Sequence, residues 1–365
     1  MAKLGDIATY INGYVFKPQD WSDEGVPIIR IQDLTGNSYQ ANRYNGKYAS
    51  KYEVNDGDVL ISWSASLGVY IWHGEKAVLN QHIFKVVFDK ERISKDFFVH
   101  QVGLILENAA SDAHGATMKH LTKPVFDALP FYLPPYEKQC EIAEVLDKVT
   151  NLISLRKQQI AKLDELVKVR FVEMFENVTE ENALENLCHF IDYRGKTPEK
   201  SDSGLPFITA KNIRMHYMSF DTQEFISKEN YDKVMTRGIP KVGDVVFTTE
   251  APLGNVCRIP QFDTDFYIGQ RIITMQTKLL NPVYLEYALS SDDFKRKLVG
   301  KSSGSTVTGI RSKLLGKLNI PVPSKELQNQ FAAFVERVDQ QKQTIQQSLE
   351  KLELLKKSLM QEYFG

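Results

Sequence analysis

The fold of this chain is decided by residues 136–175, which read YEKQCEIAEVLDKVTNLISLRKQQIAKLDELVKVRFVEMF and contain neither glycine nor proline. The apolar side chains recur three and four residues apart, with two gaps of seven that Arg156 and Arg170 fill. This spacing is typical of a coiled-coil helix. The apolar positions of the frame are Ile142, Leu146, Val149, Ile153, Ile160, Leu163, Val167 and Met174.

A second segment repeats this frame, because an offset of 189 residues takes Ile142 to Phe331 and preserves the spacing. Lys342 and Lys356 interrupt the second frame at staggered positions. Each helix is predicted to cover about 34 residues, or roughly 50 Å at 1.5 Å per residue. The apolar positions of the second frame are Phe331, Val335, Val338, Ile345, Leu349, Leu352, Leu359 and Tyr363.

Two helices of equal length can bury these stripes on each other, and a pseudo-two-fold arrangement requires them to run antiparallel. Surplus leucines widen the stripe beyond a simple seam, so it needs a further partner or covering from the globular regions. The surplus positions are Leu152, Leu155, Leu166 and Leu355. We expect the helix and partner interface to include Ile153, Ile160, Leu163, Leu166, Ile345, Leu349, Leu352 and Leu355.

The segments before the helices also repeat. Residues 27–34 match 206–213 at an offset of 179, and from Gln81 against Gln270 onward the offset stays at 189. Where the offset between the two halves changes, before Gln81 and Gln270, we expect insertions in loops. Where it stays at 189, through the long helices, both helices have the same length. The repeat indicates two similar binding units at a fixed separation, and a duplication that merely doubles a domain is the alternative.

Short alternating apolar patterns typical of strands fill the regions outside the helices, and helical patterns there are fewer, covering residues 95–108 and 282–299. We therefore predict an α+β fold in which two similar domains with mostly antiparallel sheet are joined by two long antiparallel coiled-coil helices. The expected boundaries are a first domain at 1–135, a central spacer helix at 136–179, a second domain at 180–322 and a C-terminal spacer helix at 323–365.

Composition describes a folded chain without excess charge. The 365 residues include 45 Lys and Arg against 46 Asp and Glu, and 42% are hydrophobic, so disordered and fibrous chains are excluded. The net charge of −1 gives no support for a strongly basic nucleic-acid-binding surface. Without a membrane-length apolar run or a signal-peptide pattern, we expect a cytoplasmic protein. Cys140, Cys188 and Cys257 show no CxxC spacing and predict neither a disulfide framework nor a metal site.

Local charge differs from the total. Between Phe294 and Lys317 there are seven basic residues and no acidic one, around the sequence Ser302-Ser303-Gly304-Ser305-Thr306. Such a loop can neutralise phosphates while its backbone and hydroxyl groups donate to them, although a solvated surface loop is the alternative.

Other loops combine Arg, Asn and Gln, which can hydrogen-bond base edges, with planar groups that can stack. The residues expected to contact DNA are Arg30, Gln32, Asn37, Tyr39, Arg43, Lys119, His120, Arg194, Lys196, Lys211, Asn212, Arg214, Lys301, Ser305, Thr306, Arg311 and Lys313.

Apparent enzyme motifs are incomplete. Residues 133–136, Leu-Pro-Pro-Tyr, resemble the Asn-Pro-Pro-Tyr loop of amino-methyltransferases, but leucine replaces the polar residue that must hold the target amine. Residues 300–302, Gly-Lys-Ser, resemble the end of a phosphate-binding loop, but Lys295 stands where the first glycine is required. Glu250 is a loop carboxylate with no visible partner for general-base chemistry. We therefore predict no catalytic residue and no metal ligand set.

The order of these features, present twice, resembles that of the specificity subunits of type I restriction-modification systems over essentially the whole chain. Each half has a sheet-rich region, a Gly-Ser/Thr loop, a Leu-Pro-Ile-Pro-like strand, a turn with Glu or Gln, and a long helix. The stretches that carry the resemblance are residues 26–30, 57–62, 304–306 with Ile310, 318–323 and 354–361.

The resemblance implies two target-recognition domains that each read one half of a split site in double-stranded DNA. The helices would act as a ruler and as the dock for two methyltransferase subunits, and restriction subunits would complete the complex. S-adenosylmethionine and the methyl-transfer residues would belong to the partner, so this chain would be non-catalytic and hold no cofactor. The alternative is a coiled-coil scaffold or decoy that binds methyltransferase subunits without reading DNA.

Overall fold

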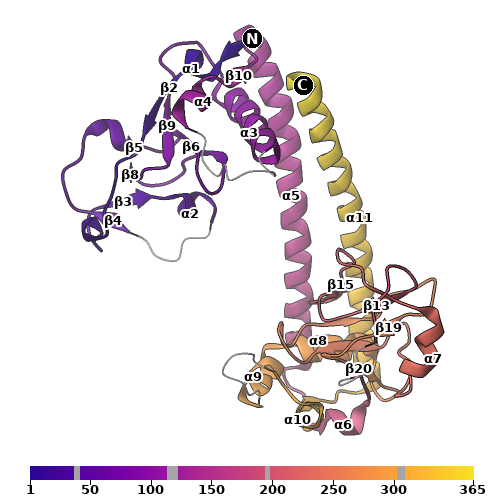
Figure 1. Ribbon diagram of the computed structural model, residues 1–365. Helices are drawn as coiled ribbons and strands as arrows, with labels where there is room; N and C mark the ends of the chain where they lie inside the picture. Colours follow the sequence, from indigo (N-terminus) through magenta and orange to yellow (C-terminus); the bar gives the residue numbers. More distant parts are fainter. Residues whose placement is uncertain (37–41, 113–121, 194–197, 302–308) are drawn as a thin grey trace. The chain divides into compact units, whose positions relative to one another are not determined.

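The computed structural model describes residues 1–36, 42–112, 122–193, 198–301 and 309–365 (Figure 1). It forms two compact units: unit 1 comprises Met1–Lys157 and Gln347–Gly365, and unit 2 comprises Gln158–Gln346. The boundary lies inside both long helices, α5 (Tyr136–Phe175) and α11 (Lys325–Phe364). Each unit therefore contains one sheet-rich domain and a part of each long helix.

Unit 1 contains two four-stranded sheets. The first has the order β2-β9-β6-β7 and is antiparallel, whereas the second has the order β4-β3-β8-β5 and includes the parallel pair β3 and β8. A short pair, β1 with β10, precedes α5. The strands are β1 (Ala2–Lys3), β2 (Thr9–Asn12), β3 (Val26–Ile29), β4 (Arg43–Tyr44), β5 (Glu53–Val54), β6 (Val59–Ser62), β7 (Gly68–Ile71), β8 (Ala77–Leu79), β9 (Ile83–Val87) and β10 (Pro130–Phe131). The helices before α5 are α1 (Leu4–Ile7), α2 (Ile31–Leu34), α3 (Lys95–Asp112) and α4 (Lys123–Asp127).

Unit 2 repeats this plan. Its four-stranded sheet has the order β12-β20-β17-β18, its second sheet β16-β13-β19 contains the parallel pair β13 and β19, and β11 pairs with β21. The strands are β11 (Glu181–Ala183), β12 (His189–Asp192), β13 (Leu205–Ile208), β14 (Ile213–Arg214), β15 (Tyr217–Met218), β16 (Phe225–Ile226), β17 (Val245–Thr248), β18 (Val256–Arg258), β19 (Tyr267–Ile268), β20 (Ile272–Gln276) and β21 (Asn319–Pro321). The helices are α6 (Leu184–Leu187), α7 (Tyr231–Val234), α8 (Pro282–Ser290), α9 (Asp292–Lys301) and α10 (Ser312–Gly316), followed by α11.

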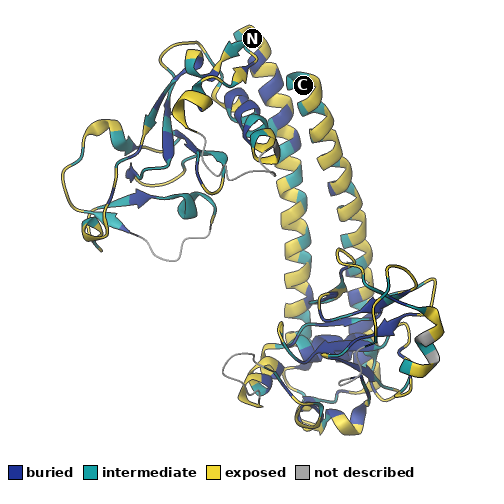
Figure 2. Ribbon diagram, viewed as in Figure 1, coloured by how far each residue is buried: buried dark blue, intermediate teal, exposed yellow. Residues whose placement is uncertain are grey.

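The core of each unit lies where its antiparallel sheet meets its helices. The central strands β6 and β17 are buried at every position, which agrees with their continuous apolar sequences. Figure 2 shows buried residues gathered in the sheets, while much of α5 and α11 is exposed. This mixed helix and sheet architecture, present twice, confirms the predicted fold class.

One predicted helix is in fact two. The apolar pattern over residues 282–299 predicts a single helix, but α8 ends at Ser290 and α9 begins at Asp292. Ser291 separates them because its hydroxyl donates to the Ala288 carbonyl at 2.8 Å and accepts from the backbone N–H of Phe294 at 3.2 Å. A serine that caps the next helix interrupts the first one.

The predicted helix frame is confirmed, since every position of both frames is buried or half-buried. Each helix has 40 residues rather than about 34, because each begins six residues before the first apolar frame position. The surplus leucines Leu152, Leu155, Leu166 and Leu355 are 44–54% exposed. No helix in the described parts of the chain is both long and apolar enough to cross a bilayer.

In unit 1 the start of α5 packs beside the end of α11. Ile142 and Leu146 are buried in the core against which Phe364 packs. Eleven residues further along α5 than Leu146, the Lys157 ammonium lies 2.9 Å from the Glu353 carboxylate. Contacts that advance along one helix and recede along the other establish an antiparallel pair.

In unit 2 the end of α5 packs beside the start of α11. The ring centroids of Phe175 and Phe331 are 5.4 Å apart, and Lys342 donates to Asp164. These contacts give the same antiparallel pairing inside the second unit.

A buried glutamine fixes each long helix to its own domain. In unit 1, Gln139 accepts from the backbone N–H of Ser94 at 2.9 Å and donates to the Pro134 carbonyl at 2.9 Å. In unit 2, Gln328 accepts from Asn281 N–H at 2.7 Å and donates to the Pro323 carbonyl at 2.8 Å. Both glutamines are 1% exposed. Each amide therefore joins the first turn of a long helix, the proline loop before it, and the start of a domain helix.

We predict that Gln328→Ala lowers the free energy of unfolding by about 1–3 kcal/mol, because it leaves a buried N–H and a buried carbonyl without partners. Gln330→Ala, at an exposed position on the same helix, should change it by less than about 0.5 kcal/mol. Urea denaturation followed by circular dichroism compares the two variants. Equal stability of the variants would contradict the role of the buried amide.

Candidate nucleic-acid interface

Eight of the residues predicted to contact DNA lie outside the described residues. The remaining candidates can be placed in their units. The eight are Asn37, Tyr39, Lys119, His120, Arg194, Lys196, Ser305 and Thr306.

The two arginines predicted in unit 1 make hydrogen bonds inside the unit. The Arg30 guanidinium lies over the Trp21 ring at 5.5 Å, and the Asn42 amide oxygen, when it faces the guanidinium, accepts from Nη1 and Nη2 at 2.8 and 2.7 Å. Arg43 donates from Nη2 to Glu75 at 2.7 Å. These groups position the segments that follow β3 and form β4. Their contact with DNA stays a prediction, as does that of Gln32, which is half-buried on α2.

Asn212 corrects a prediction, because it is only 4% exposed and its amide is fully used. Its oxygen accepts from the backbone N–H of Thr209 at 2.9 Å, and its nitrogen donates to the carbonyls of Ser219 and Thr222 at 3.0 and 2.8 Å. It holds a turn closed and has no group left for a base edge. Asp33 has the same role in unit 1, where its carboxylate accepts from Arg30 N–H at 2.8 Å.

A basic hollow of about 360 Å³ lies at the end of β13 in unit 2. Lys200 and Lys211 both approach the Glu224 carboxylate, at 2.9 and 3.4 Å, and the hydrogen bond from Lys200 holds the pKa of Glu224 below its ordinary value. Thr209, Gln270 and Arg271 complete the polar lining. Of these residues only Lys211 was predicted. The constant repeat offset that begins at Gln81 and Gln270 aligns this turn between the two halves but did not mark it as a site.

The neighbouring Arg214 is used locally, since its Nη1 donates to the Lys211 carbonyl at 2.6 Å. Arg214 therefore supports the backbone that carries Lys211.

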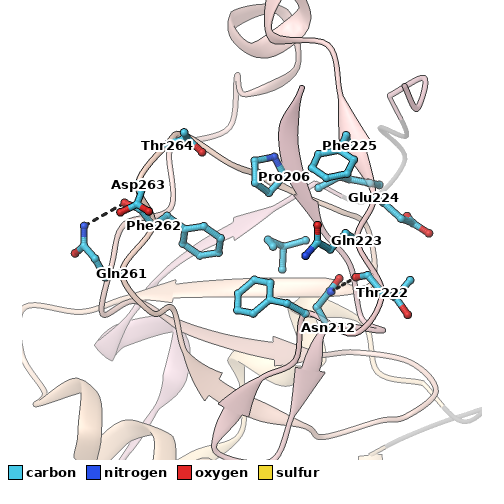
Figure 3. Close-up of a pocket in the computed structure, with 13 residues that line it drawn as sticks. Pro206, Asn212, Thr222, Gln223, Glu224, Phe225, Gln261, Phe262, Asp263 and Thr264 are labelled. Atoms are coloured by element: carbon cyan, nitrogen blue, oxygen red, sulfur yellow. Dashed lines mark hydrogen bonds between the residues drawn. The ribbon is translucent and has the colours of Figure 1, made fainter. Parts of the chain in front are cut away.

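An aromatic pocket of about 370 Å³ lies on the same domain (Figure 3). The figure shows Asn212 and Thr222 on one side, with Phe262 and Gln261 on another. Four phenylalanine rings line the pocket together with polar side chains that include Gln223 and Gln261. Such a surface can pack against planar or apolar groups while these two amides hydrogen-bond.

The basic residues between 294 and 317 fall into two groups, one paired with carboxylates and one without such pairs among the described residues. Lys297 lies 2.7 Å from Glu181 and 2.9 Å from Asp293, and Arg296 lies 3.3 Å from Asp293. The first part of the cluster is therefore neutralised by carboxylates outside it. In the second part, Lys301, Arg311 and Lys313 are exposed, and no described carboxylate is in ion-pair contact with them. These three remain the better candidates for phosphate contact.

A buried charge network attaches the β14–β15 hairpin of unit 2 to its helices. Glu286 of α8, 1% exposed, lies 2.9 Å from His216 and 2.6 Å from Arg258, and Arg258 lies 3.7 Å from Asp339 of α11. Burial raises the pKa of the Asp339 carboxyl, although Lys342 and, to a smaller extent, Arg258 oppose the rise. The network stabilises the placement of the domain on the helix inside unit 2.

The described residues contain no group of three or more His, Cys, Asp and Glu side chains that could hold a metal ion. Glu250 has a partner, since Arg271 Nε lies 2.9 Å from its carboxylate. The polar groups on these surfaces include cations and amides, which suit phosphates and base edges, together with the carboxylates Glu224 and Asp263.

The type I restriction modification DNA specificity domain matches residues 1–165 and, a second time, residues 179–354. The chain belongs to this family. It is a specificity subunit of a type I restriction-modification system, with two DNA specificity domains consistent with a bipartite recognition site. The resemblance stated from the sequence is thereby confirmed.

Two curated relatives span most of the chain. The EcoBI specificity subunit of Escherichia coli is 24% identical over 377 residues, covering 92% of this chain and 78% of the relative. The MjaVIII specificity subunit of Methanocaldococcus jannaschii is 24% identical over 390 residues, covering 99% and 90%.

Two solved structures share the fold. The S subunit from M. genitalium gives a TM-score of 0.59 at 14% identity, with 100% of this chain and 95% of that chain covered. A chain from a study of complex assembly and conformational transition of the type I R-M system gives 0.56 at 17% identity, with 100% and 99% covered.

Substitutions at the adjacent residues Lys211 and Asn212 should distinguish a role in DNA binding from a role in the stability of this specificity subunit. We predict that Asn212→Ala lowers the free energy of unfolding by about 2–3 kcal/mol, because buried donors and acceptors lose their partners. Lys211→Ala, at an exposed residue, should leave stability unchanged and lower the salt dependence of DNA binding by about one phosphate contact. Denaturation curves and binding titrations at several salt concentrations measure both. A fully stable Asn212→Ala variant with altered base preference would restore the original prediction for this residue.

Proposed function

We propose that this chain selects a split DNA site for a type I complex and leaves the chemistry to its partners. Each unit reads one half-site in double-stranded DNA, and the long helices set the spacing between the half-sites. The observation that carries this proposal is the repetition of a whole unit, including the buried amide that fixes each domain to a helix: Gln139 in unit 1 and Gln328 in unit 2.

The partners we propose are two methyltransferase subunits docked on the helices, with restriction subunits joining through them. The exposed leucines Leu152, Leu155, Leu166 and Leu355 support this assignment, because apolar side chains outside a helix seam favour a further protein surface. Relatives named as specificity subunits of type I restriction enzymes agree with such partners.

Methyl transfer and its donor, S-adenosylmethionine, are assigned to the methyltransferase subunits, so this chain acts without a cofactor. Because the substrate is double-stranded DNA, we place the complex in the cytoplasm. Phosphate contacts come from local groups such as Lys211, Lys301 and Arg311, since the chain as a whole carries a net charge of −1.

The function is tested by mixing the purified chain with the methyltransferase subunit of its own system and titrating duplex DNA. We predict site-selective binding that weakens steeply as salt rises, because phosphate contacts release counterions. The readout is fluorescence anisotropy with a library of duplexes. Tight partner binding without any DNA selectivity would support the scaffold alternative instead.

The ruler is tested by inserting one heptad into each long helix, after Gln158 in α5 and after Gln346 in α11. We predict a longer non-specific spacer with both half-sites unchanged, because seven residues add about 10 Å of helix while preserving the apolar face. Sequencing of methylated sites in the assembled complex measures both. An unchanged spacer length would overturn the ruler.

A further inference from the structure

The chain leaves the second sheet of each unit at the end of a parallel strand pair. In unit 1, Ile29 of β3 is opposite Leu79 of β8, and the backbone N–H of Asn80 donates to the Ile29 carbonyl at 3.1 Å. In unit 2, Ile208 is opposite Ile268, and the N–H of Gly269 donates to the Ile208 carbonyl at 2.7 Å (Figure 1). Because the paired strands are parallel, the residues after both strands lie at the same sheet edge.

At this edge each unit holds a non-glycine residue in the left-handed region. His82 has φ = 73° and Arg271 has φ = 71°, at positions related by the constant repeat offset of 189. Such a conformation costs free energy for any residue with a Cβ, and it persists where surrounding contacts enforce it. Trp63 N–H donates to the His82 carbonyl at 3.2 Å, and Thr249 N–H donates to the Arg271 carbonyl at 2.9 Å. The two units therefore enforce the same strained turn with different side chains.

The residue before each strained position is a glutamine. Gln81 and Gln270 are both half-buried, and within the described residues neither side-chain amide makes a hydrogen bond. By contrast, the amides of Asn212, Gln139 and Gln328 are used inside the protein. A glutamine amide can donate to and accept from the major-groove edge of adenine at the same time.

Cations surround the glutamine in unit 2. Lys200, Lys211 and Arg271 line the same hollow as Gln270, with the Lys200 and Lys211 ammonium groups sharing the Glu224 carboxylate. Ile310 joins this edge, because its backbone N–H donates to the Thr249 carbonyl at 2.9 Å. An amide without a hydrogen-bond partner among the described residues thus lies beside two ammonium groups that share one carboxylate, while Arg271 is paired with Glu250.

In unit 1 the corresponding edge carries Gln32, which stands at the position of Lys211 at an offset of 179. Gln32 follows β3 and Gln81 follows β8, so the parallel pair brings two amides to one edge.

We infer that Gln81 and Gln270 are specificity-determining residues, one for each half-site, which contact a base edge in the major groove, with adenine as the matching base. The inference rests on the proposed function. The left-handed turns at His82 and Arg271 present the amides, and Lys200 and Lys211 contact the adjacent phosphates in unit 2.

The test assembles the full chain with the methyltransferase subunit of its system and treats a plasmid library in which the split site is randomised. Sequencing of methylated plasmids then gives the preference at each position. Gln270→Ala should reduce discrimination at one position of one half-site by roughly 5- to 100-fold, the range for a bidentate base contact. Gln81→Ala should do the same in the other half-site only.

Matched controls are Gln330→Ala in unit 2 and Gln19→Ala in unit 1, both at exposed glutamines away from these turns. They should leave both half-sites unchanged. Gln270→Glu provides a second variant of nearly the same shape, and it should shift the preference at the same position toward cytosine, whose amino group a carboxylate can accept from.

The outcomes separate the inference from the function. A selective wild-type complex whose preferences are unchanged in Gln81→Ala, Gln270→Ala and Gln270→Glu would overturn the inference alone. A wild-type complex with no site preference would overturn the proposed function. If Gln270→Ala fails to fold, the Gln270→Glu variant decides the result for unit 2.

Discussion

The attachment of each domain to its long helix depends on a buried amide. Gln139 and Gln328 each satisfy one backbone donor and one backbone acceptor that come from separate segments. Because an unsatisfied buried polar group is costly, the three segments stay together or the unit loses stability. A neutral amide achieves this without the desolvation cost of a buried charge.

Charged contacts add a second attachment that differs between the units. In unit 1, His100 of α3 lies 2.7 Å from Asp147 of α5. In unit 2, Glu286 connects through Arg258 to Asp339 of α11. The shared glutamine and the distinct charges suit a duplicated frame whose two copies have diverged. In the ruler that we propose, a firm domain–helix attachment is what allows helix length to determine the spacing between half-sites.

A repeated backbone with differing side chains is also found at the edge of the second sheet of each unit, where its parallel strands end. Both units close the turn after the first parallel strand with a side chain, Asp33 or Asn212, and both hold a left-handed residue after the second, His82 or Arg271. The backbone and the glutamine at positions 81 and 270 are repeated, whereas the neighbouring side chains differ: Gln32 and His82 in unit 1, Lys211 and Arg271 in unit 2. The two domains therefore share one fold and one amide but differ in the charge beside it.

The two long helices with their heptad frame, the repeat and the fold class were all determined by sequence. These features depend on local spacing, and each position of the frame from Ile142 to Tyr363 that the sequence assigned to the seam is buried or half-buried. The helix break at Ser291, which the sequence analysis did not predict, also has a local cause. The Ser291 hydroxyl caps the next helix, and the spacing of apolar residues does not reveal such a cap.

Tertiary structure decided which polar side chains are available for a ligand. Asn212 has the right chemistry for adenine, yet its amide closes a turn, and Lys297 belongs to a basic cluster yet is neutralised by Glu181, more than a hundred residues away in sequence. Gln81 and Gln270 are unremarkable in sequence until parallel strand pairing brings them to an edge. Hydrogen bonds and ion pairs between segments distant in sequence occupy some polar side chains and leave others of the same type without a partner. The spacing of apolar residues therefore determines the helices, whereas long-range contacts determine which polar groups can still bind a ligand.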